Sequence, residues 1–292
     1  MNFRLSAIRF MNLLTLMCVL ATIPSTLSAE GIDVMTPVMD PAQAAVPWDD
    51  QHQPWARTLE RIVKPDGVDY QSLRRDHADL DLYLGQLAHA PEPHDTPEKL
   101  AFYINAYNAC TVYVVNLLLP EDATQWPQWS IAVAGTPPGT VWKGYRFEIA
   151  GRRLTLDAIE HQILRPLGDP RIHLAINCAS RSCPALAPLP YRAATLDSQL
   201  NDAAHTFVVD AQQLRLHDGV LLINPILSWF GDDFKPVGGV RVFLRTQAED
   251  VEKIKPHSLE PLITYLSGTA ALQFFAYDWR LNITAESGVK KP

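Results

Sequence analysis

Two cysteines near the middle of the sequence are the side chains best suited to chemistry. Cys178 and Cys183 lie within the stretch HLAINCASRSCP, which runs from His173 to Pro184. A thiol becomes a good nucleophile when its pKa is lowered and a base lies nearby, and histidine is the usual base. The stretch therefore predicts thiol chemistry, although the same two cysteines are compatible with other structures.

Three alternatives place different demands on Cys178 and Cys183. In the first, Cys178 is a nucleophile and either His173 or His161 is its base. In the second, the two cysteines form a disulfide, which an oxidising compartment favours. In the third, the two cysteines and the two histidines bind zinc, although their spacing is not that of a CxxC or HExxH motif. The sequence leaves all three open and does not decide which histidine is the base.

Amide and acid side chains are candidates to orient a catalytic imidazole. Glu160 projects into the apolar face of a helix expected over residues 155–165. Three asparagines, Asn105, Asn108 and Asn116, share one sector of a longer helix. An unpaired buried amide costs about 1 to 3 kcal/mol, so we expect these asparagines to bond to the backbone of neighbouring loops. The candidate catalytic residues are Cys178, His173, His161, Glu160, Asn105, Asn108, Asn177 and Cys183.

The elements that must position these residues are helices mixed with short strands. An apolar helix over residues 96–119 is expected to be buried at the centre of the fold. Alternating apolar residues predict β-hairpins over residues 141–154 and 213–223, and a strand over residues 171–177. We therefore expect a single α+β domain with a mixed or antiparallel sheet.

The predicted strand over residues 171–177 constrains the candidate site. Side chains of a regular strand alternate between two faces, so His173 and Cys178 would point to opposite sides of the sheet. They could meet only if the strand bulges or ends near Asn177. His161 is free of this restriction, because it lies on a separate helix.

Composition excludes some classes of partner. The chain has 292 residues with 25 Lys and Arg against 32 Asp and Glu, which gives a formal net charge of −7. This mildly acidic balance lacks the basic surface of a nucleic-acid binder, so no nucleic-acid partner is expected. No cofactor is indicated, and the substrate or protein partner is not specified by the sequence.

The N-terminus has the pattern of a secretory signal. Two arginines precede an apolar run from Met11 to Ile23, and small residues follow up to Ala29. A mature protein exported in this way would be periplasmic or secreted and would meet the membrane only during export. The predicted organisation is a signal peptide over residues 1–29, an extended arm over residues 30–55 and one globular domain over residues 56–292.

Five motifs in this order resemble the domain-of-unknown-function family numbered 547. They are AFYINAYNA (Ala101–Ala109), LTLDAIEHQILR (Leu154–Arg165), DPRIHLAINCASRSCP (Asp169–Pro184), ILSWFGDDF (Ile226–Phe234) and YDWRLN (Tyr277–Asn282). The resemblance implies that all eight candidate residues are family motif positions, whereas Cys110 stands where an aliphatic residue is expected. It also implies export, which is common among bacterial members, whereas some eukaryotic members carry glutaredoxin-like or leucine-zipper segments. It brings no established activity.

These observations favour an exported thiol-dependent hydrolase or acyl-transferase that acts on an amide or ester through Cys178. Backbone amides near Ala179 or Ser180 would hold the oxyanion. A thiol, a histidine and an amide on an α+β frame are reminiscent of papain-like and transglutaminase-like enzymes, which is a fold-level analogy. The alternative is a non-enzymatic structural or protein-interaction module with a Cys178–Cys183 disulfide.

Overall fold

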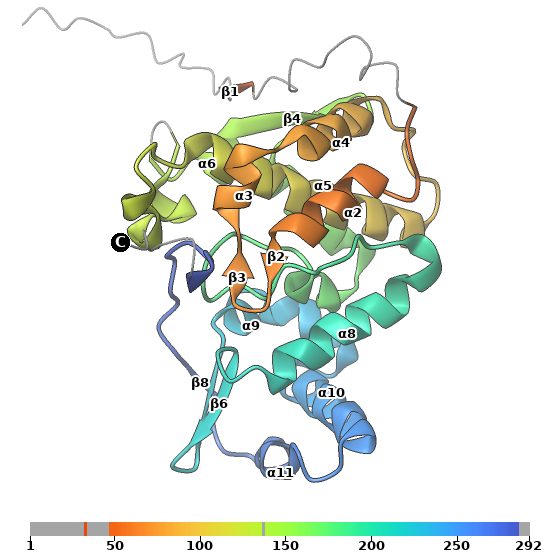
Figure 1. The fold of residues 1–292 in the computed structure, drawn as a ribbon. Helices are drawn as coiled ribbons and strands as arrows, with labels where there is room; N and C mark the ends of the chain where they lie inside the picture. Colours follow the sequence, from red (N-terminus) through yellow and green to blue (C-terminus); the bar gives the residue numbers. More distant parts are fainter. Residues whose placement is uncertain (1–31, 34–46, 136–137, 286–292) are drawn as a thin grey trace, which may run out of the picture. The chain divides into compact units, whose positions relative to one another are not determined.

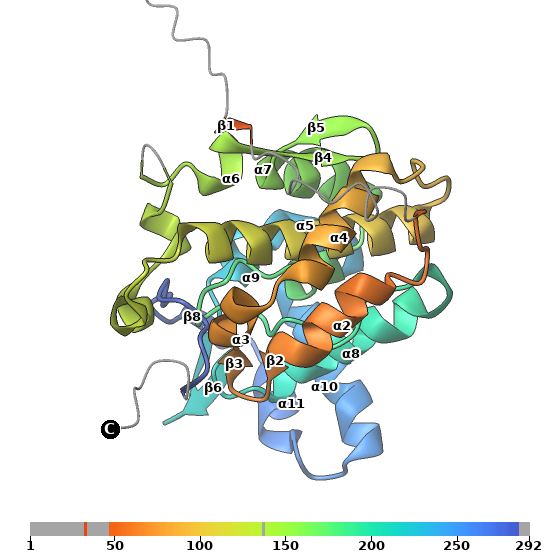
Figure 2. The same cartoon turned by 45° about the horizontal axis from the view of Figure 1, so that its top comes forward.

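A long buried helix, α5 (Thr96–Leu118), is the element around which much of the fold packs (Figures 1 and 2). The computed structural model describes residues 32–33, 47–135 and 138–285. The Asp95 side chain caps α5 by accepting a hydrogen bond from the Glu98 N–H, and Pro97 occupies an early position that needs no donor. Because its middle turns are buried on every side, the prediction of a central apolar helix is confirmed.

Helices cover α5 along its length. α3 and α4 pack against it, as do α7 and α8, while α2 packs on α3 and α4 (Figure 2). The α-helices of the described residues are α2 (Gln53–Ile62), α3 (Tyr70–Arg75), α4 (Ala78–His89), α5, α6 (Val141–Gly144), α7 (Leu156–Ala158), α8 (Leu196–Val209), α9 (Ile226–Trp229), α10 (Val240–Ile254) and α11 (Glu260–Ser267). Tighter 3-10 turns are η1 (Ala123–Gln128), η2 (Ile131–Val133), η4 (Arg165–Leu167), η5 (Pro170–Leu174), η6 (Ala193–Thr195) and η7 (Gly231–Val237), and η3 (Ile159–Leu164) is a π-helix.

The strands are short and belong to three small sheets in the described residues. The first has the order β1-β4-β5, the second pairs β2 with β3, and the third has the order β6-β7-β8. Their bounds are β1 (Ile32–Asp33), β2 (Val63–Lys64), β3 (Gly67–Val68), β4 (Tyr145–Ile149), β5 (Arg152–Leu154), β6 (Leu214–His217), β7 (Val220–Ile223) and β8 (Gln273–Phe274). β1 runs parallel to β4 and β8 runs parallel to β7, while the remaining pairs are antiparallel.

Both predicted hairpins are present. β4 and β5 turn at Ala150 and Gly151, and β6 and β7 turn at Asp218 and Gly219, with positive φ at all four residues. Two consecutive positive φ angles suit the right-handed twist of the flanking strands. These hairpins, together with the helices, confirm the α+β class and the single domain.

Two hydrophobic clusters lie side by side. The larger surrounds α5 and contains Tyr103 and Tyr107, and the smaller lies between α8, α10 and α11 and contains Phe207 and Leu244. α10, which the sequence analysis did not predict, packs against both α8 and α11 (Figure 1). The segment that leads to Cys178 runs between the two clusters.

The prediction of a strand over residues 171–177 is wrong, since residues 170–174 form the 3-10 turn η5. Pro170 sets the first turn, and the Asp169 side chain accepts a hydrogen bond from the Arg171 N–H. The alternation of apolar residues arose because Ile172 and Leu174 face different clusters. Residues 172–177 are all buried, so the pattern reflected two cores rather than two faces of a sheet.

The N-terminal predictions are tested only in part. The signal peptide predicted over residues 1–29 and most of the arm predicted over residues 30–55 lie outside the described residues. The arm is shorter than predicted, because α2 already begins at Gln53. In the part of the chain that is described, no helix is both long and apolar enough to cross a membrane.

Asn108 joins α5 to the segment that leads to the cysteines, which generates a stability prediction. Its Nδ2 donates to the Ala175 carbonyl (3.0 Å) and its Oδ1 accepts from the Asn177 N–H (2.8 Å). Asn108→Leu should leave both buried backbone groups unpaired and lower the free energy of unfolding by about 2 to 4 kcal/mol. Chemical denaturation measures this change.

Asn116→Leu is the matched control on the same helix. The Asn116 Oδ1 is buried without a hydrogen-bond partner in the described structure, so replacing it breaks no hydrogen bond of that oxygen and should cost less than about 1 kcal/mol. Equal losses for the two variants would contradict the bracing role of Asn108.

Candidate functional site

Cys178 and Cys183 face each other across a tight loop, residues 178–183, which we call the thiol loop. Both are free thiols, with their Sγ atoms 2.8 Å apart. The Cys178 Sγ also lies 3.2 Å from the Ser180 Oγ and 3.2 Å from the Tyr277 hydroxyl. Cys183 is buried, whereas Cys178 is partly exposed, so only Cys178 is open to a reactant.

Asn177 and a strained backbone hold the thiol loop closed. The Asn177 Oδ1 accepts from the Ala179 N–H (2.8 Å) and its Nδ2 donates to the Pro184 carbonyl (2.7 Å), so one side chain joins both ends of the loop. Ala179 has a φ of 59°, a left-handed conformation that non-glycine residues seldom adopt. Such strain is retained where surrounding bonds enforce it.

The two thiols differ in acidity because their surroundings differ. Hydrogen bonds from Cys183, Ser180 and Tyr277 lower the pKa of Cys178 to about 7, since donors stabilise the thiolate. Burial raises the pKa of Cys183 well above its usual value, because a thiolate there would be desolvated. At neutral pH the Cys178 thiol is therefore the one that ionises.

The backbone amides of the thiol loop are already engaged. The Cys178 N–H donates to the Cys183 Sγ (2.8 Å) and the Ala179 N–H to the Asn177 Oδ1 (2.8 Å). The amides of residues 181–183 donate to backbone carbonyls. An oxyanion donor was expected near Ala179 or Ser180: the Ala179 N–H is engaged by Asn177, whereas the Ser180 amide contributes to the lowered pKa of Cys178.

A C-terminal segment over residues 277–283 clamps the thiol loop from outside. The Arg181 N–H donates to the Arg280 carbonyl (2.8 Å) and the Asn282 N–H donates to the Ala179 carbonyl (3.1 Å). This clamp brings Tyr277 to the Cys178 sulfur and Trp279 to the same region. Tyr277 was not among the predicted site residues, although it lies in the YDWRLN motif.

Cys178 opens into a cavity of about 210 Å³. Five predicted site residues line it: Glu160, His161, His173, Cys178 and Cys183. Six aromatic side chains form much of its remaining wall: Tyr107, Trp142, Trp229, Phe230, Tyr277 and Trp279. Pockets that bind small molecules are typically apolar with a few convergent polar groups, which describes this cavity.

The three predicted asparagines support the cavity without lining it. Asn105 donates to the Tyr191 carbonyl (2.7 Å) and accepts from the Tyr191 N–H (2.9 Å). Asn108 bonds in the same way to the segment before Cys178, and Asn177 closes the thiol loop. The interpretation that the asparagines of the central helix bond to loop backbone is confirmed for Asn105 and Asn108 but not for Asn116, whose Oδ1 is buried without a hydrogen-bond partner. A role of these asparagines in orienting a histidine is not observed.

Glu160 is a buried carboxyl group in the cavity wall. It lies on the π-helix η3, where the Arg165 N–H bonds back to the Glu160 carbonyl, and π-helical turns are frequent at functional sites. The Tyr107 hydroxyl donates to its Oε2 at 3.3 Å. Burial and the nearby Cys178 thiolate raise the pKa of Glu160 to about 7, so the group exchanges a proton readily at neutral pH.

His173 is held by a carboxylate that the sequence analysis did not select, that of Asp233. Its Nε2 lies 2.8 Å from the Asp233 Oδ2, and its ring stacks on Phe230 with centroids 4.0 Å apart. Burial lowers the pKa of His173 to about 4, and its Nδ1 is buried without a hydrogen-bond partner. Asp233, which was not among the candidate residues, orients His173 in place of Glu160 or Asn177.

Asp233 is in turn fixed by Arg165. The guanidinium donates from Nε and Nη2 to the two carboxylate oxygens at 2.7 and 2.8 Å. This bidentate pair, more than the neutral histidine, lowers the pKa of Asp233 to about 2. His173, Asp233 and Arg165 therefore form a bonded wall of the cavity, and no hydrogen bond joins His173 to Cys178.

His161 lies at the rim of the cavity. Its side chain is 37% exposed, its Nε2 is 3.6 Å from the Asp157 Oδ1, and its Nδ1 is 3.1 Å from an Arg165 nitrogen. Partial burial lowers the pKa of His161. Both histidines are thus occupied by partners other than Cys178.

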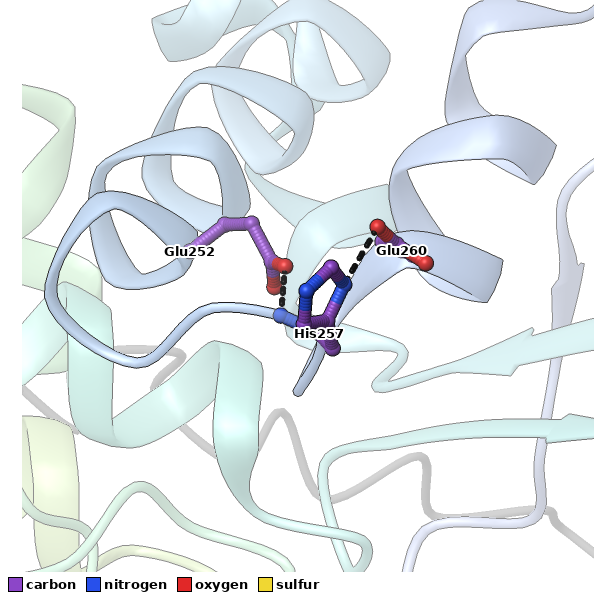
Figure 3. Close-up of side chains that lie close together, drawn as sticks. All are labelled: Glu252, His257 and Glu260. Carbon is purple, nitrogen blue, oxygen red and sulfur yellow. Dashed lines mark hydrogen bonds and ion pairs between the residues drawn. The ribbon is translucent and has the colours of Figure 1, made fainter.

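The zinc alternative requires ligand atoms that converge on one point. In the described residues, one group of three metal-ligand side chains places its ligand atoms within 4.8 Å of one another, and it consists of Glu252, His257 and Glu260 (Figure 3). The two histidines and two cysteines near the cavity form no such group. In Figure 3, His257 lies between the two glutamates, and Glu252 also accepts from the Leu259 N–H (2.7 Å), which fixes the turn from α10 to α11.

Comparison with known proteins gives one match. Residues 91–208 match the family model described as "Protein of unknown function, DUF547", so the resemblance to this family is confirmed over that segment. No curated protein and no solved structure matches the chain. The matched segment contains all eight predicted site residues, whereas Asp233 and Tyr277 come from the chain beyond it.

The raised pKa of Glu160 makes stability depend on pH. A carboxyl group whose folded pKa is about 7, against an ordinary 4.5, contributes stability below pH 4.5 that is lost as the pH rises through 7. Glu160→Gln removes this loss. Between pH 5 and pH 8 the free energy of unfolding of the variant should therefore rise by about 1 to 3 kcal/mol relative to that of the parent protein. Urea denaturation at both pH values measures it, and Glu121→Gln at an exposed position should show no such gain.

The short distance between the sulfurs predicts oxidation to a disulfide. Sγ atoms 2.8 Å apart must approach by less than about 1 Å to reach a covalent bond length near 2.05 Å. Hydrogen peroxide should therefore join Cys178 to Cys183 in the folded protein, and peptide mass mapping before and after reduction detects the bond. Persistence of both free thiols, or stoichiometric zinc by elemental analysis, would contradict this prediction.

Proposed function

We propose that the protein is a thiol-dependent hydrolase or acyl-transferase that acts on an amide or ester through Cys178. The observation that carries the proposal is the position of the Cys178 sulfur, which is partly exposed at an aromatic cavity while several donors stabilise its thiolate. Their combined effect, a pKa of about 7, leaves much of the thiol ionised at neutral pH. A structural cysteine needs neither feature.

Glu160 is the group best placed to exchange protons with the reactants. Its pKa responds to the charge on Cys178, whereas the pKa of His173 is governed by burial and by Asp233. A carboxyl group with a pKa near the operating pH suits general acid and base catalysis. In this proposal Glu160 donates a proton in the first stage of the reaction and accepts one in the second, and His173 forms part of the cavity wall.

The reaction would proceed in two stages. The Cys178 thiolate attacks the carbonyl carbon, the bond to the leaving nitrogen or oxygen breaks, and the Glu160 carboxylic acid protonates the leaving group. Water, or an acceptor nucleophile, then attacks the thioester while the Glu160 carboxylate accepts its proton, and Cys178 leaves as a thiolate. The first stage loads the acyl group and the second releases or transfers it.

Hydrogen-bond donors around the Cys178 sulfur would also stabilise the oxyanion. The thiolate loses its charge when it bonds to carbon, and a negative oxygen forms on that carbon beside it. In this proposal the Ser180 N–H, which favours the thiolate, and the Tyr277 hydroxyl, 3.2 Å from the sulfur, donate to this oxygen. Of the two expected donors, Ser180 is kept and Tyr277 takes the place of Ala179.

The alternative is a non-enzymatic module in which Cys178 and Cys183 form a structural disulfide. Their 2.8 Å separation is the observation that favours it. The two functions differ in one testable respect: only the enzyme needs Cys178 as a reactive free thiol in the resting protein.

Alkylation with iodoacetamide tests the proposed nucleophile. Cys178 should label with an apparent pKa of about 7, while the buried Cys110 stays unlabelled in the folded protein. Tyr277→Phe removes one donor to the thiolate and should raise the apparent pKa by about one unit. Tyr265→Phe, an exposed hydroxyl that bonds to the Ala271 carbonyl, is the control and should leave the profile unchanged.

Reaction with p-nitrophenyl acetate extends the test to acyl transfer. A burst of p-nitrophenol and an acetyl group mapped to Cys178 are expected, and Glu160→Gln should slow turnover more than the burst. Slow alkylation of the reduced protein with no acylation of Cys178 would overturn the proposal in favour of the structural module.

A further inference from the structure

The cavity at Cys178 has an aromatic wall with a well-defined geometry. Trp229 stacks on Trp279 with ring centroids 5.7 Å apart and an interplanar angle of 11°, and Tyr277 packs on both at 4.9 and 4.5 Å. Trp142 meets Trp279 edge to face at 6.0 Å. Trp229 is 50% exposed, so the wall presents ring surface at the opening of the cavity.

The charges of the lining are all of one sign. Asp157 and Glu160 line the cavity, and no lysine or arginine does. Two cations lie nearby, but Arg165 is bonded bidentately to Asp233, and Lys143 is 80% exposed at 3.7 Å from Asp157. Glu160 is buried and has no ion-pair partner among the described residues.

Aromatic faces and carboxylates together recognise one chemical class. The face of an aromatic ring carries partial negative charge and attracts ammonium cations, and a desolvated carboxylate gains by acquiring a cationic partner. An anionic group would meet the Asp157 carboxylate and the Glu160 carboxyl group, and no lysine or arginine of the lining would compensate its charge. A neutral apolar group would fill the cavity but would give the Asp157 carboxylate no cationic partner there.

We infer that the substrate processed by Cys178 carries a small ammonium group, which binds in this cavity against Trp229 and Trp279 with Asp157 as its counter-charge, while Glu160 keeps the proton that it donates to the leaving group. The inference rests on the proposed function and specifies its substrate class. The volume of about 210 Å³ admits one compact cationic group rather than a polymer segment. The carbonyl group to be attacked would lie next to the ammonium end, at the Cys178 sulfur.

Two matched small molecules test the inference. Choline and 3,3-dimethylbutan-1-ol have almost the same shape and differ in the charge of the quaternary centre. Isothermal titration calorimetry is carried out on the Cys178→Ala protein, in which binding is measured without acyl chemistry. Choline should bind at least tenfold more tightly than the neutral alcohol, and 3,3-dimethylbutyrate, the anionic counterpart, should bind more weakly than either.

Variants assign the binding to the cavity. Trp229→Ala should weaken choline binding about 3- to 30-fold, as expected for loss of a cation–π contact, while Trp229→Phe should retain most of it. Phe274→Ala, at an exposed aromatic residue away from the cavity lining, is the control and should bind choline normally. Near-ultraviolet circular dichroism checks that each variant is folded.

Each outcome decides a separate claim. Equal binding of choline and the neutral alcohol, or no binding of choline, would overturn the ammonium assignment even if Cys178 alkylates as expected. Choline binding to the cavity together with an unreactive Cys178 would support the ammonium site and overturn the proposed acyl chemistry.

Discussion

The hydrogen bonds of the Asn177 amide are the constraint on which the candidate site depends. With its oxygen on the Ala179 N–H and its nitrogen on the Pro184 carbonyl, this side chain closes the loop that brings Cys178 and Cys183 together. Its own backbone N–H is held by Asn108 of the central helix. A series of hydrogen bonds from side-chain amides therefore connects the core of the protein to the thiol loop. These bonds enforce the left-handed backbone at Ala179, which a free loop would avoid.

Differences in solvation divide the ionisable groups of the site into separate roles. Cys178 and Cys183 are chemically identical, yet donors around one and burial of the other separate their pKa values in opposite directions. Glu160 is a buried carboxyl group with a single hydroxyl donor, so it holds its proton near neutrality. Asp233 has a bidentate guanidinium and remains ionised far into acid. Two kinds of ionisable group, thiol and carboxyl, thus provide a nucleophile, a proton donor and a fixed charge.

The site is assembled from distant parts of the chain. The segment that matches the family supplies the cysteines, Glu160 and both histidines, whereas Asp233 and Tyr277 come from beyond residue 208. Backbone hydrogen bonds between the thiol loop and residues 277–283 deliver Tyr277 to the sulfur and Trp279 to the cavity wall. The pKa of Cys178 therefore depends on a contact between residues about 100 positions apart in sequence, and the nucleophile is complete only when the C-terminal segment is docked.

Local sequence patterns were sufficient to predict the elements that are stabilised by interactions between neighbouring residues. The sequence predicted α5 from its long apolar stretch, and it predicted the two hairpins from their turn residues. Both predictions succeeded because capping and turn conformations depend on neighbouring residues. The eight candidate residues were also selected by their chemistry, and five of them line one cavity. The sequence alone thus determined the α+β class and the group of residues from which a site could form.

Tertiary structure decided what each of those residues does. The alternation over residues 171–177 predicted a strand, but burial between two clusters produces the same pattern in a 3-10 turn. Asp233 was not a candidate residue, yet it is the partner of His173, because Arg165 lies beside it only in the folded chain. The engagement of the Ala179 amide, the donors at Cys178 and the burial of Glu160 all arise from contacts between remote segments. Hydrogen-bond partners and solvation set pKa values and reactivity, and these depend on the packing of the whole chain rather than on residue type.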